Sequence, residues 1–218
     1  GKIINEFLES GIIIEEREGK STGGRKPLLL NINKEKIGKI LGVYFAPTFV
    51  QISIGDIDGY IFSSRRLRLG DLGGDIIGET EKIVEGILKK NKDINIISVV
   101  MNGLVDIEKG ISIFSPHYNT KNIPIVERFT KKFKKKIFLE NDVRAMALAE
   151  KVYGLCKENN NFVVLNIEEG VGGSIYLNNM LYHGYGSMSG ELGHMVVKRN
   201  SLEKCSCGKK GCLETEVS

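Results

Sequence analysis

The stretch from Cys205 to Glu214, CSCGKKGCLE, holds three of the chain's four cysteines. Ten residues separate Cys205 from His194, which lies upstream in GELGHMVV. Three thiolates and one imidazole are a standard ligand set for structural zinc, and glycines let so short a loop turn sharply. We therefore predict a Zn²⁺ ion bound by His194, Cys205, Cys207 and Cys212. The alternative is three free thiols beside a core histidine.

The composition is that of a soluble globular protein. The chain has 218 residues, of which 41% are hydrophobic and 27% charged, and no apolar run is long enough to span a bilayer. We expect a cytoplasmic protein without a membrane partner, and clustered thiols in that compartment favour a metal over disulfides. The net charge of +4 permits DNA binding without indicating it. Both ends interrupt a pattern, so we expect a fragment of a longer chain.

The first 36 residues have the outline of part of a winged helix-turn-helix. A helical apolar stripe is followed by two extended runs, IIIEERE and PLLLNIN, with GKSTGGRKP between them. Gly23 and Gly24 allow a tight turn, and Arg25 and Lys26 bring charge to the tip, as suits a DNA minor groove. Lys2 is the basic residue on what remains of the helix. The alternative is an ordinary basic hairpin.

Residues 37–218 alternate strands and helices, which indicates an α/β fold with a mixed sheet. KILGVYF, FVQISIGD and GYIFSSRRLRL predict three strands with tight turns, and residues 75–90 predict a helix. INIISVVMNG and NFVVLNI suit strands buried on both faces. IPIVERFTKKF and DVRAMALAEKVYG predict helices, the second with an acidic cap, and Asn178-Asn179 predicts a hairpin turn. The basic run TKKFKKK predicts a solvated helix end.

Several segments resemble the ROK family, whose name stands for repressor, open reading frame, kinase. They are SGELGHMVV with CSCGKKGCLE, LENDVRAMALAEKVYG, EEGVGGSIYLNNMLYHGYGSMSGELGH and STGGRKP. The resemblance covers nearly the whole chain, and the cysteine segment is its most specific part. It implies an actin-like sugar-kinase (ribonuclease H-like) fold of two α/β lobes, the first present and the second truncated.

The family contains sugar kinases and sugar-responsive repressors, and two loops bear on the choice. In kinases of this fold the first phosphate loop commonly has the sequence Asp-x-Gly-Gly-Thr. Residues 44–48 of this chain read YFAPT, and Pro47 has no N–H to donate to a phosphate. The second phosphate loop of the kinases resembles Gly-Thr-Gly-x-Gly. The matching residues 168–172 of this chain read EEGVG, so Glu168 and Glu169 would face a bound triphosphate. Each pair of like charges ~5 Å apart costs about 3 kcal/mol at an effective dielectric of ~20. We therefore expect no enzyme activity and no catalytic residue.

The resemblance also implies a sugar site. Asn141 and Asp142 begin a helix at a strand end, and Asp142 matches the general base of the kinases. Glu191 and Glu214 resemble the family's other sugar-contacting acids, and His194 resembles a residue that serves both zinc and sugar. The alternatives are that Asp142 is only an N-cap and that the two glutamates are solvated acids.

These expectations predict a sugar-responsive transcriptional repressor with a degenerate, non-catalytic sensor domain. Its partners would be operator DNA, a small sugar effector and further copies of itself as a homodimer or homotetramer. The ending CLETEVS and the wing resemble the xylose and N-acetylglucosamine repressors, which favours xylose or a related sugar. The alternative is a ROK sugar kinase with an unusual phosphate site.

Overall fold

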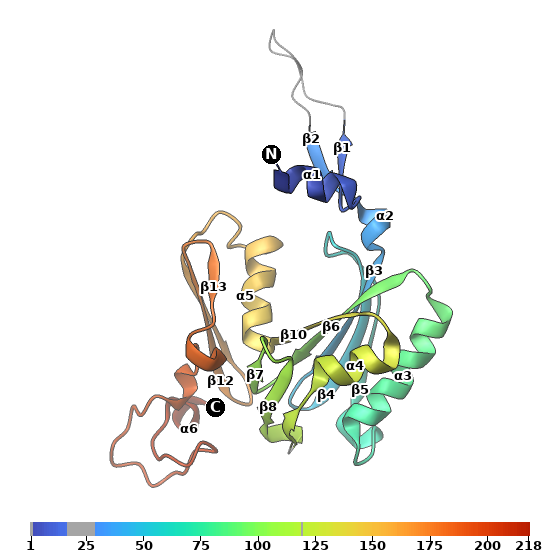
Figure 1. Cartoon of the computed structure of the whole chain (residues 1–218). Helices are drawn as coiled ribbons and strands as arrows, with labels where there is room; N and C mark the ends of the chain where they lie inside the picture. Colours follow the sequence, from blue (N-terminus) through green and yellow to red (C-terminus); the bar gives the residue numbers. More distant parts are fainter. Residues whose placement is uncertain (1, 17–28, 119) are drawn as a thin grey trace.

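The N-terminal part consists of two short helices and a two-stranded sheet. The structure is a computed structural model that describes residues 2–16, 29–118 and 120–218. Helix α1 (Lys2–Glu9) precedes the antiparallel strands β1 (Ile13–Glu16) and β2 (Leu29–Ile32), and α2 (Lys34–Ile37) leads into the main body (Figure 1). The apolar stripe expected on α1 is present, but Ile3, Ile4 and Phe7 are exposed to solvent.

A five-stranded mixed sheet forms the first lobe, in the order β10-β6-β3-β4-β5. Strands β3, β6 and β10 run parallel, while β4 and β5 return antiparallel beside β3. The strands are β3 (Lys39–Phe45), β4 (Phe49–Gly55), β5 (Ile61–Arg68), β6 (Ile94–Met101) and β10 (Lys136–Asn141). The three strands predicted between residues 39 and 69 are confirmed. The sheet agrees with the α/β expectation.

Helices α3 (Ile76–Lys90) and α4 (Ile125–Phe133) pack on one face of this sheet and close the main core. Alternate residues of each strand point into it, among them Leu41, Val50 and Leu67. Buried Glu81 of α3 pairs with Arg128 and Lys132 of α4, which joins the two helices. The opposite face of the sheet carries Tyr44 and Arg66, which are described below.

A small antiparallel sheet, β7-β8-β9, is an element that the sequence patterns did not reveal. It comprises β7 (Leu104–Asp106), β8 (Ile111–Ser115) and β9 (Thr120–Ile123), with the 3₁₀ turn η2 (Pro116–Tyr118) before β9. It lies between the end of β6 and the start of α4 (Figure 1). Its place matters because β7 contacts the strand that leads to the predicted sugar site.

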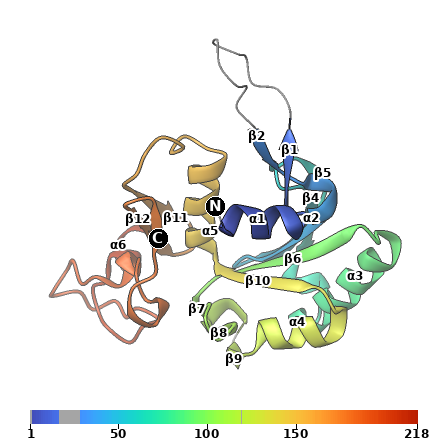
Figure 2. The same cartoon turned by 45° about the horizontal axis from the view of Figure 1, so that its top comes forward.

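The second part of the α/β body is α5 (Asp142–Val152) with the antiparallel sheet β11-β12-β13. Its strands are β11 (Phe162–Ile167), β12 (Val171–Leu177) and β13 (Met180–Tyr182). Asn178 and Asn179 both have positive φ, so the predicted hairpin turn is confirmed. Figure 2 shows α5 between this sheet and β10.

Strand β11 differs from the expectation of a strand buried on both faces. One face packs toward α5, but Val163, Leu165 and Ile167 are 57%, 50% and 52% exposed. A run of apolar residues gives no periodic signal, so pattern alone does not separate a covered strand from a half-covered one. The three-stranded sheet therefore has an apolar face that the described residues leave open.

The chain ends with the cysteine loop. The 3₁₀ turns η3 (Tyr185–Ser187) and η4 (Leu192–His194) lead into it, η1 (Leu69–Asp71) having followed β5 in the first lobe. Helix α6 (Leu213–Val217) begins directly after Cys212. None of the described helices is long and apolar enough to cross a bilayer.

Candidate functional site

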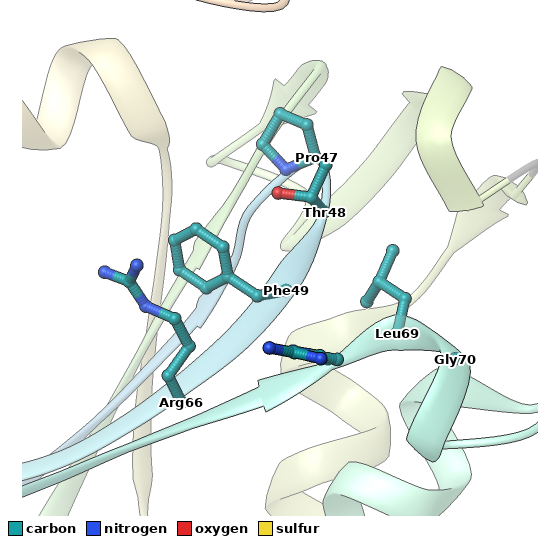
Figure 3. Close-up of a pocket in the computed structure, with 7 residues that line it drawn as sticks. Pro47, Thr48, Phe49, Arg66, Leu69 and Gly70 are labelled. Carbon is teal, nitrogen blue, oxygen red and sulfur yellow. The ribbon is translucent and has the colours of Figure 1, made fainter.

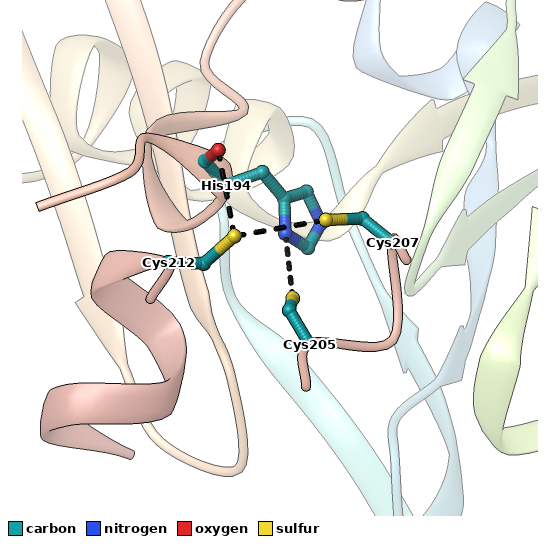
Figure 4. Close-up of side chains that lie close together, drawn as sticks. All are labelled: His194, Cys205, Cys207 and Cys212. Carbon is teal, nitrogen blue, oxygen red and sulfur yellow. Dashed lines mark hydrogen bonds between the residues drawn. The ribbon is translucent and has the colours of Figure 1, made fainter. Parts of the chain in front are cut away.

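The predicted zinc ligands form one cluster. One donor atom from each of His194, Cys205, Cys207 and Cys212 lies within 4.8 Å of all the others (Figure 4). The sulfurs of Cys207 and Cys212 are 3.7 Å apart, and Cys205 Sγ is 3.4 Å from His194 Nδ1. A tetrahedral zinc ion with bonds of about 2.3 Å places its thiolates about 3.8 Å apart, which is close to the observed spacing. The residues therefore fit a closed tetrahedral site.

The backbone of the loop is shaped to bring these ligands together. Isolated β-bridges pair Val196 with Cys212 and Lys204 with Lys210. Gly211 has φ +68°, and a Cβ there would stand 1.9 Å from the carbonyl oxygen of Lys198. Only glycine fits this position. Few of the loop's side chains are apolar, so bound metal would supply stability that a hydrophobic core cannot.

His194 connects the metal cluster to a predicted sugar residue. Its Nδ1 faces Cys205, while its Nε2 lies 3.7 Å from a carboxylate oxygen of Glu191. A carboxylate on the outer nitrogen of a metal-ligating histidine fixes the ring's orientation and tautomer. Glu191 therefore lies where the metal cluster can orient it.

Glu214 joins the cysteine loop to the turn between β11 and β12. Its Oε1 lies 3.6 Å from Cys205 Sγ, and its Oε2 accepts the backbone N–H of Val171 at 3.3 Å. A Cβ on Gly170 would come within 3.0 Å of the same carboxylate. The second phosphate loop thus gives one of its amides to a carboxylate of the same chain.

Asn141, and not an acid, caps α5. Its side-chain oxygen accepts the N–H of Arg144 at 3.1 Å, and Asp142 is the first helical residue. The expectation of an acidic cap is therefore wrong, because the strand end brings Asn141 to the N-cap position one residue earlier. Because Asn141 is the N-cap, the alternative that Asp142 serves only as an N-cap is excluded as well.

Asp142 is buried and well supplied with donors. Its carboxylate accepts hydrogen bonds from the side chains of Asn102, at 3.0 Å, and Asn141, at 2.9 Å, and from the backbone N–H of Val143 at 2.9 Å. Burial raises the pKa of Asp142, and these hydrogen bonds oppose that rise.

The predicted acids lie close enough to influence one another. Partial desolvation raises the pKa of Glu191, whose side chain is 44% exposed, while Coulomb interactions with His194 and Arg144 lower that pKa and those with Asp142 and Glu214 raise it. A carboxylate with a raised pKa beside other acids is a frequent feature of ligand sites. The structure thus gathers Asp142, Glu191, His194 and Glu214 into one neighbourhood.

Arg144 is a residue of this neighbourhood that the sequence analysis did not single out. It is 3% exposed, pairs with Glu140 at 2.6 Å, and donates to the carbonyl oxygens of Ser187 at 2.7 Å and Val105 at 3.2 Å. It thereby holds η3, the segment before Glu191, against α5 and β7. The sequence does hold a sign that Arg144 is buried, because it lies on the same helix face as the apolar residue Ala147.

Both loops that match the kinase phosphate loops use their amides internally. The N–H of Ala46 donates to the carbonyl oxygen of Phe49 at 2.9 Å, and Pro47 has none. The hydroxyl of Tyr118 donates to the carbonyl oxygen of Ala46. In the second loop, the N–H of Glu168 donates to the carbonyl oxygen of Gly170 at 3.0 Å. Each loop thus uses at least one of the amides that would otherwise cradle a phosphate, and Pro47 removes another from the first loop.

The predicted DNA-contacting residues are only partly covered by the structure. Lys2 lies on α1 and is exposed. Gly23, Gly24, Arg25 and Lys26 lie outside the described residues. Strands β1 and β2, which flank them, pair antiparallel as a hairpin requires. The basic run at residues 130–136 forms the end of α4 and the start of β10, where Lys131 pairs with Glu127.

The chain resembles known proteins along its whole length. The ROK family matches residues 41–218. The xylose repressor of Bacillus spizizenii is 30% identical over 99% of this chain and 56% of its own length. The DNA-binding transcriptional dual regulator NagC of Escherichia coli is 27% identical over 98% of this chain and 53% of its own. The chain therefore spans about half the length of the curated relatives it matches.

Several solved structures have a fold similar to that of this chain. A ROK family transcriptional regulator, described as a homolog of the E. coli MLC protein, superposes with a TM-score of 0.79 at 27% identity, covering 100% of this chain and 56% of its own. A ROK family glucokinase from Streptomyces griseus, in complex with glucose and AMPPNP, has a TM-score of 0.73 at 24% identity, covering 82% of this chain and 56% of its own. The second likeness bears on the fold alone.

Proposed function

Because the chain belongs to the ROK family, we propose that it is part of a sugar-responsive transcriptional repressor and not a sugar kinase. The names of its relatives support this assignment, since one is a xylose repressor and the other a DNA-binding transcriptional dual regulator. In this proposal residues 1–36 are part of a winged helix-turn-helix that contacts operator DNA, and residues 37–218 sense the sugar. The protein acts in the cytoplasm as a homodimer or homotetramer.

The observation that carries the proposal is the state of the two phosphate loops. In a kinase of this fold the backbone amides of both loops bind the phosphates of ATP. Here Ala46 and Glu168 donate within their own turns, Val171 donates to Glu214, and Pro47 has no donor. ATP would have to displace these internal contacts before it could use the same amides, and each lost hydrogen bond costs about 0.5–1.5 kcal/mol.

The sugar in this proposal contacts Asn141, Asp142, Glu191, His194 and Glu214. Charged and amide groups around a buried carboxylate suit the hydroxyl groups of a sugar, which both donate and accept hydrogen bonds. Zn²⁺ held by His194 and the three cysteines would stabilise the loop that carries His194 and Glu214. Because one of the relatives named above is a xylose repressor, we favour xylose or a related sugar.

Two measurements on the purified protein test the proposal. A coupled ATP assay with a panel of pentoses and hexoses should show no sugar-dependent turnover. Isothermal titration should show saturable binding of one sugar, weakened at least about tenfold by Asp142→Asn, a loss of about 1.4 kcal/mol. Turnover that disappears in Asp142→Asn would establish the alternative, a ROK sugar kinase.

DNA binding is tested separately with the full-length protein. Operator fragments selected from random DNA should bind it, and the sugar found by titration should change that affinity. A control variant, Glu79→Gln, lies on α3 away from the site and should behave as the wild type. Failure to select any sequence would refute the repressor assignment even if sugar binds.

A further inference from the structure

A cavity lies beside the first phosphate loop and has no role in the proposal so far. It has a volume of about 640 Å³ and lies where β4 begins and β5 ends (Figure 3). Thr48 and Phe49 border it on one side and Arg66 and Arg68 on the other. Two of its described lining residues are arginines and none is acidic. An acid-free cavity with two cations is suited to an anion.

The strand register puts both arginines on the same face of the sheet. Arg66 is opposite Gln51 and Arg68 is opposite Phe49, while Leu67 between them points into the core. Residues two apart on a strand project from the same face about 6.6 Å apart. Arginine side chains that start from the same face at that backbone spacing are long enough for both guanidinium groups to contact one tetrahedral anion.

Arg66 is held in position before any ligand arrives. Its guanidinium carbon lies 4.0 Å from the centre of the Phe49 ring, and its Nη2 donates to the side-chain oxygen of Gln51 at 3.2 Å. In Figure 3 the Arg66 side chain lies alongside the Phe49 ring. Among the described residues, neither arginine forms an ion pair with a carboxylate. Their charge is therefore available to a ligand, and less side-chain entropy is lost on binding.

We propose that Arg66 and Arg68 bind the phosphate group of a small phosphorylated ligand in this cavity, next to Thr48. Planar guanidinium groups bind phosphate oxygens in pairs, with geometry that a lysine does not provide. The site lies beside a loop in which Ala46 donates within its own turn and Pro47 has no N–H, so the two arginine side chains are the phosphate donors in this proposal. The phosphate could belong to a sugar phosphate or be free inorganic phosphate.

A second part of the inference, that the ligand extends toward the proposed sugar site, rests on the proposed function. The Tyr44 ring packs edge-on against Phe49 with ring centres 5.9 Å apart. Burial, together with the charges of Asp142 and Glu168, raises the pKa of Tyr44 to about 12, so Tyr44 is close enough to those acids to interact with them. A ligand whose phosphate contacts the arginines can therefore extend past Tyr44 toward Asp142.

Isothermal titration at constant ionic strength tests the proposal, with inorganic phosphate, glucose 6-phosphate, glucose and ATP as probes. We expect saturable binding of inorganic phosphate or glucose 6-phosphate. Arg66→Gln and Arg68→Gln should each weaken it by about tenfold or more. Arg65→Gln is the matched control, because Arg65 lies on the same strand but on the opposite face, opposite buried Ile52. It should bind as the wild type.

The outcomes distinguish a sugar phosphate from free phosphate as the ligand, and failure of the phosphate site from failure of the repressor assignment. Stronger binding of glucose 6-phosphate than of inorganic phosphate identifies a sugar phosphate as the ligand class, and equal binding identifies phosphate alone. Absence of binding by both probes, or equal loss in all three arginine variants, overturns the phosphate site. Glucose-dependent turnover of ATP would refute the repressor assignment but not the site, provided that phosphate binding still requires Arg66 and Arg68.

Discussion

Replacing Arg144 by methionine removes the guanidinium that connects three separate segments. Arg144 pairs with Glu140 at 2.6 Å and donates to the carbonyl oxygens of Ser187 and Val105. Methionine fills a similar volume, so the change isolates the polar contacts from packing. The change leaves a carboxylate without its cation and two carbonyl groups without these donors.

The expected loss follows from those contacts. Breaking a buried ion pair by removing one partner costs about 3–5 kcal/mol, and each unpaired carbonyl adds about 1–3 kcal/mol. The side chain of Glu140 is 17% exposed, so water partly replaces its lost partner. We therefore expect the free energy of unfolding to fall by about 3–5 kcal/mol, near the upper end for single substitutions.

Urea unfolding followed by circular dichroism, with zinc held constant, measures this loss. With an m value of about 3 kcal/mol/M, the midpoint should fall by about 1–1.7 M. Lys151→Met on the same helix is the control, because Lys151 donates to two carbonyl groups at an exposed position and should cost less than about 1 kcal/mol. A loss in Arg144→Met no larger than that of Lys151→Met would refute the reasoning.

Three further results are expected. His194→Ala should lose zinc, measured by metal analysis against about one ion per chain in the wild type, whereas exposed His117→Ala should keep it; full occupancy in His194→Ala would exclude that ligand. Because burial raises the folded-state pKa of Asp142, its contribution to stability is present at low pH and is lost as pH rises from about 4 through the folded-state pKa. Asp142→Asn should remove this loss. The free energy of unfolding of the variant, measured in urea, should therefore increase relative to that of the wild type as pH rises; a difference that stays constant with pH would contradict this. Gly190→Ala should lower thermal stability strongly, because φ is +89° and a Cβ would stand 2.0 Å from the carbonyl oxygen of Gly173, whereas Gly74→Ala, which meets nothing within 4 Å, should not; equal melting temperatures would oppose the steric argument.

The sequence predicted the regular elements of the fold well. Strands such as β4 and helices such as α3 and α4 have clear periods, because one side of each faces a core. The sheet β7-β8-β9 was missed because its strands have only three to five residues, too few to establish an alternation. Helix α2 was missed for a similar reason, since its four residues depend on the cap by Asn33.

The candidate site was predictable where its residues carry a motif and not where they depend on distant contacts. Cysteine spacing predicted the metal cluster, because its ligands lie close together in the sequence. The link between Glu214 and Val171 joins residues 43 apart, and that between Arg144 and Ser187 joins residues 43 apart as well. No local pattern encodes such pairs. The exposed face of β11 was also missed, because burial depends on what packs over a strand.

That exposed face has a consequence for handling the protein. Val163, Leu165 and Ile167 form an apolar row on β11, and Met180 and Tyr182 of β13 are exposed as well. Contiguous apolar surface of this kind favours self-association in water, and more so in kosmotropic salts such as sulfate. Light scattering of the purified chain should therefore show a mean particle size that increases with protein concentration. Titrations are best performed dilute, where colloidal association does not mimic ligand binding.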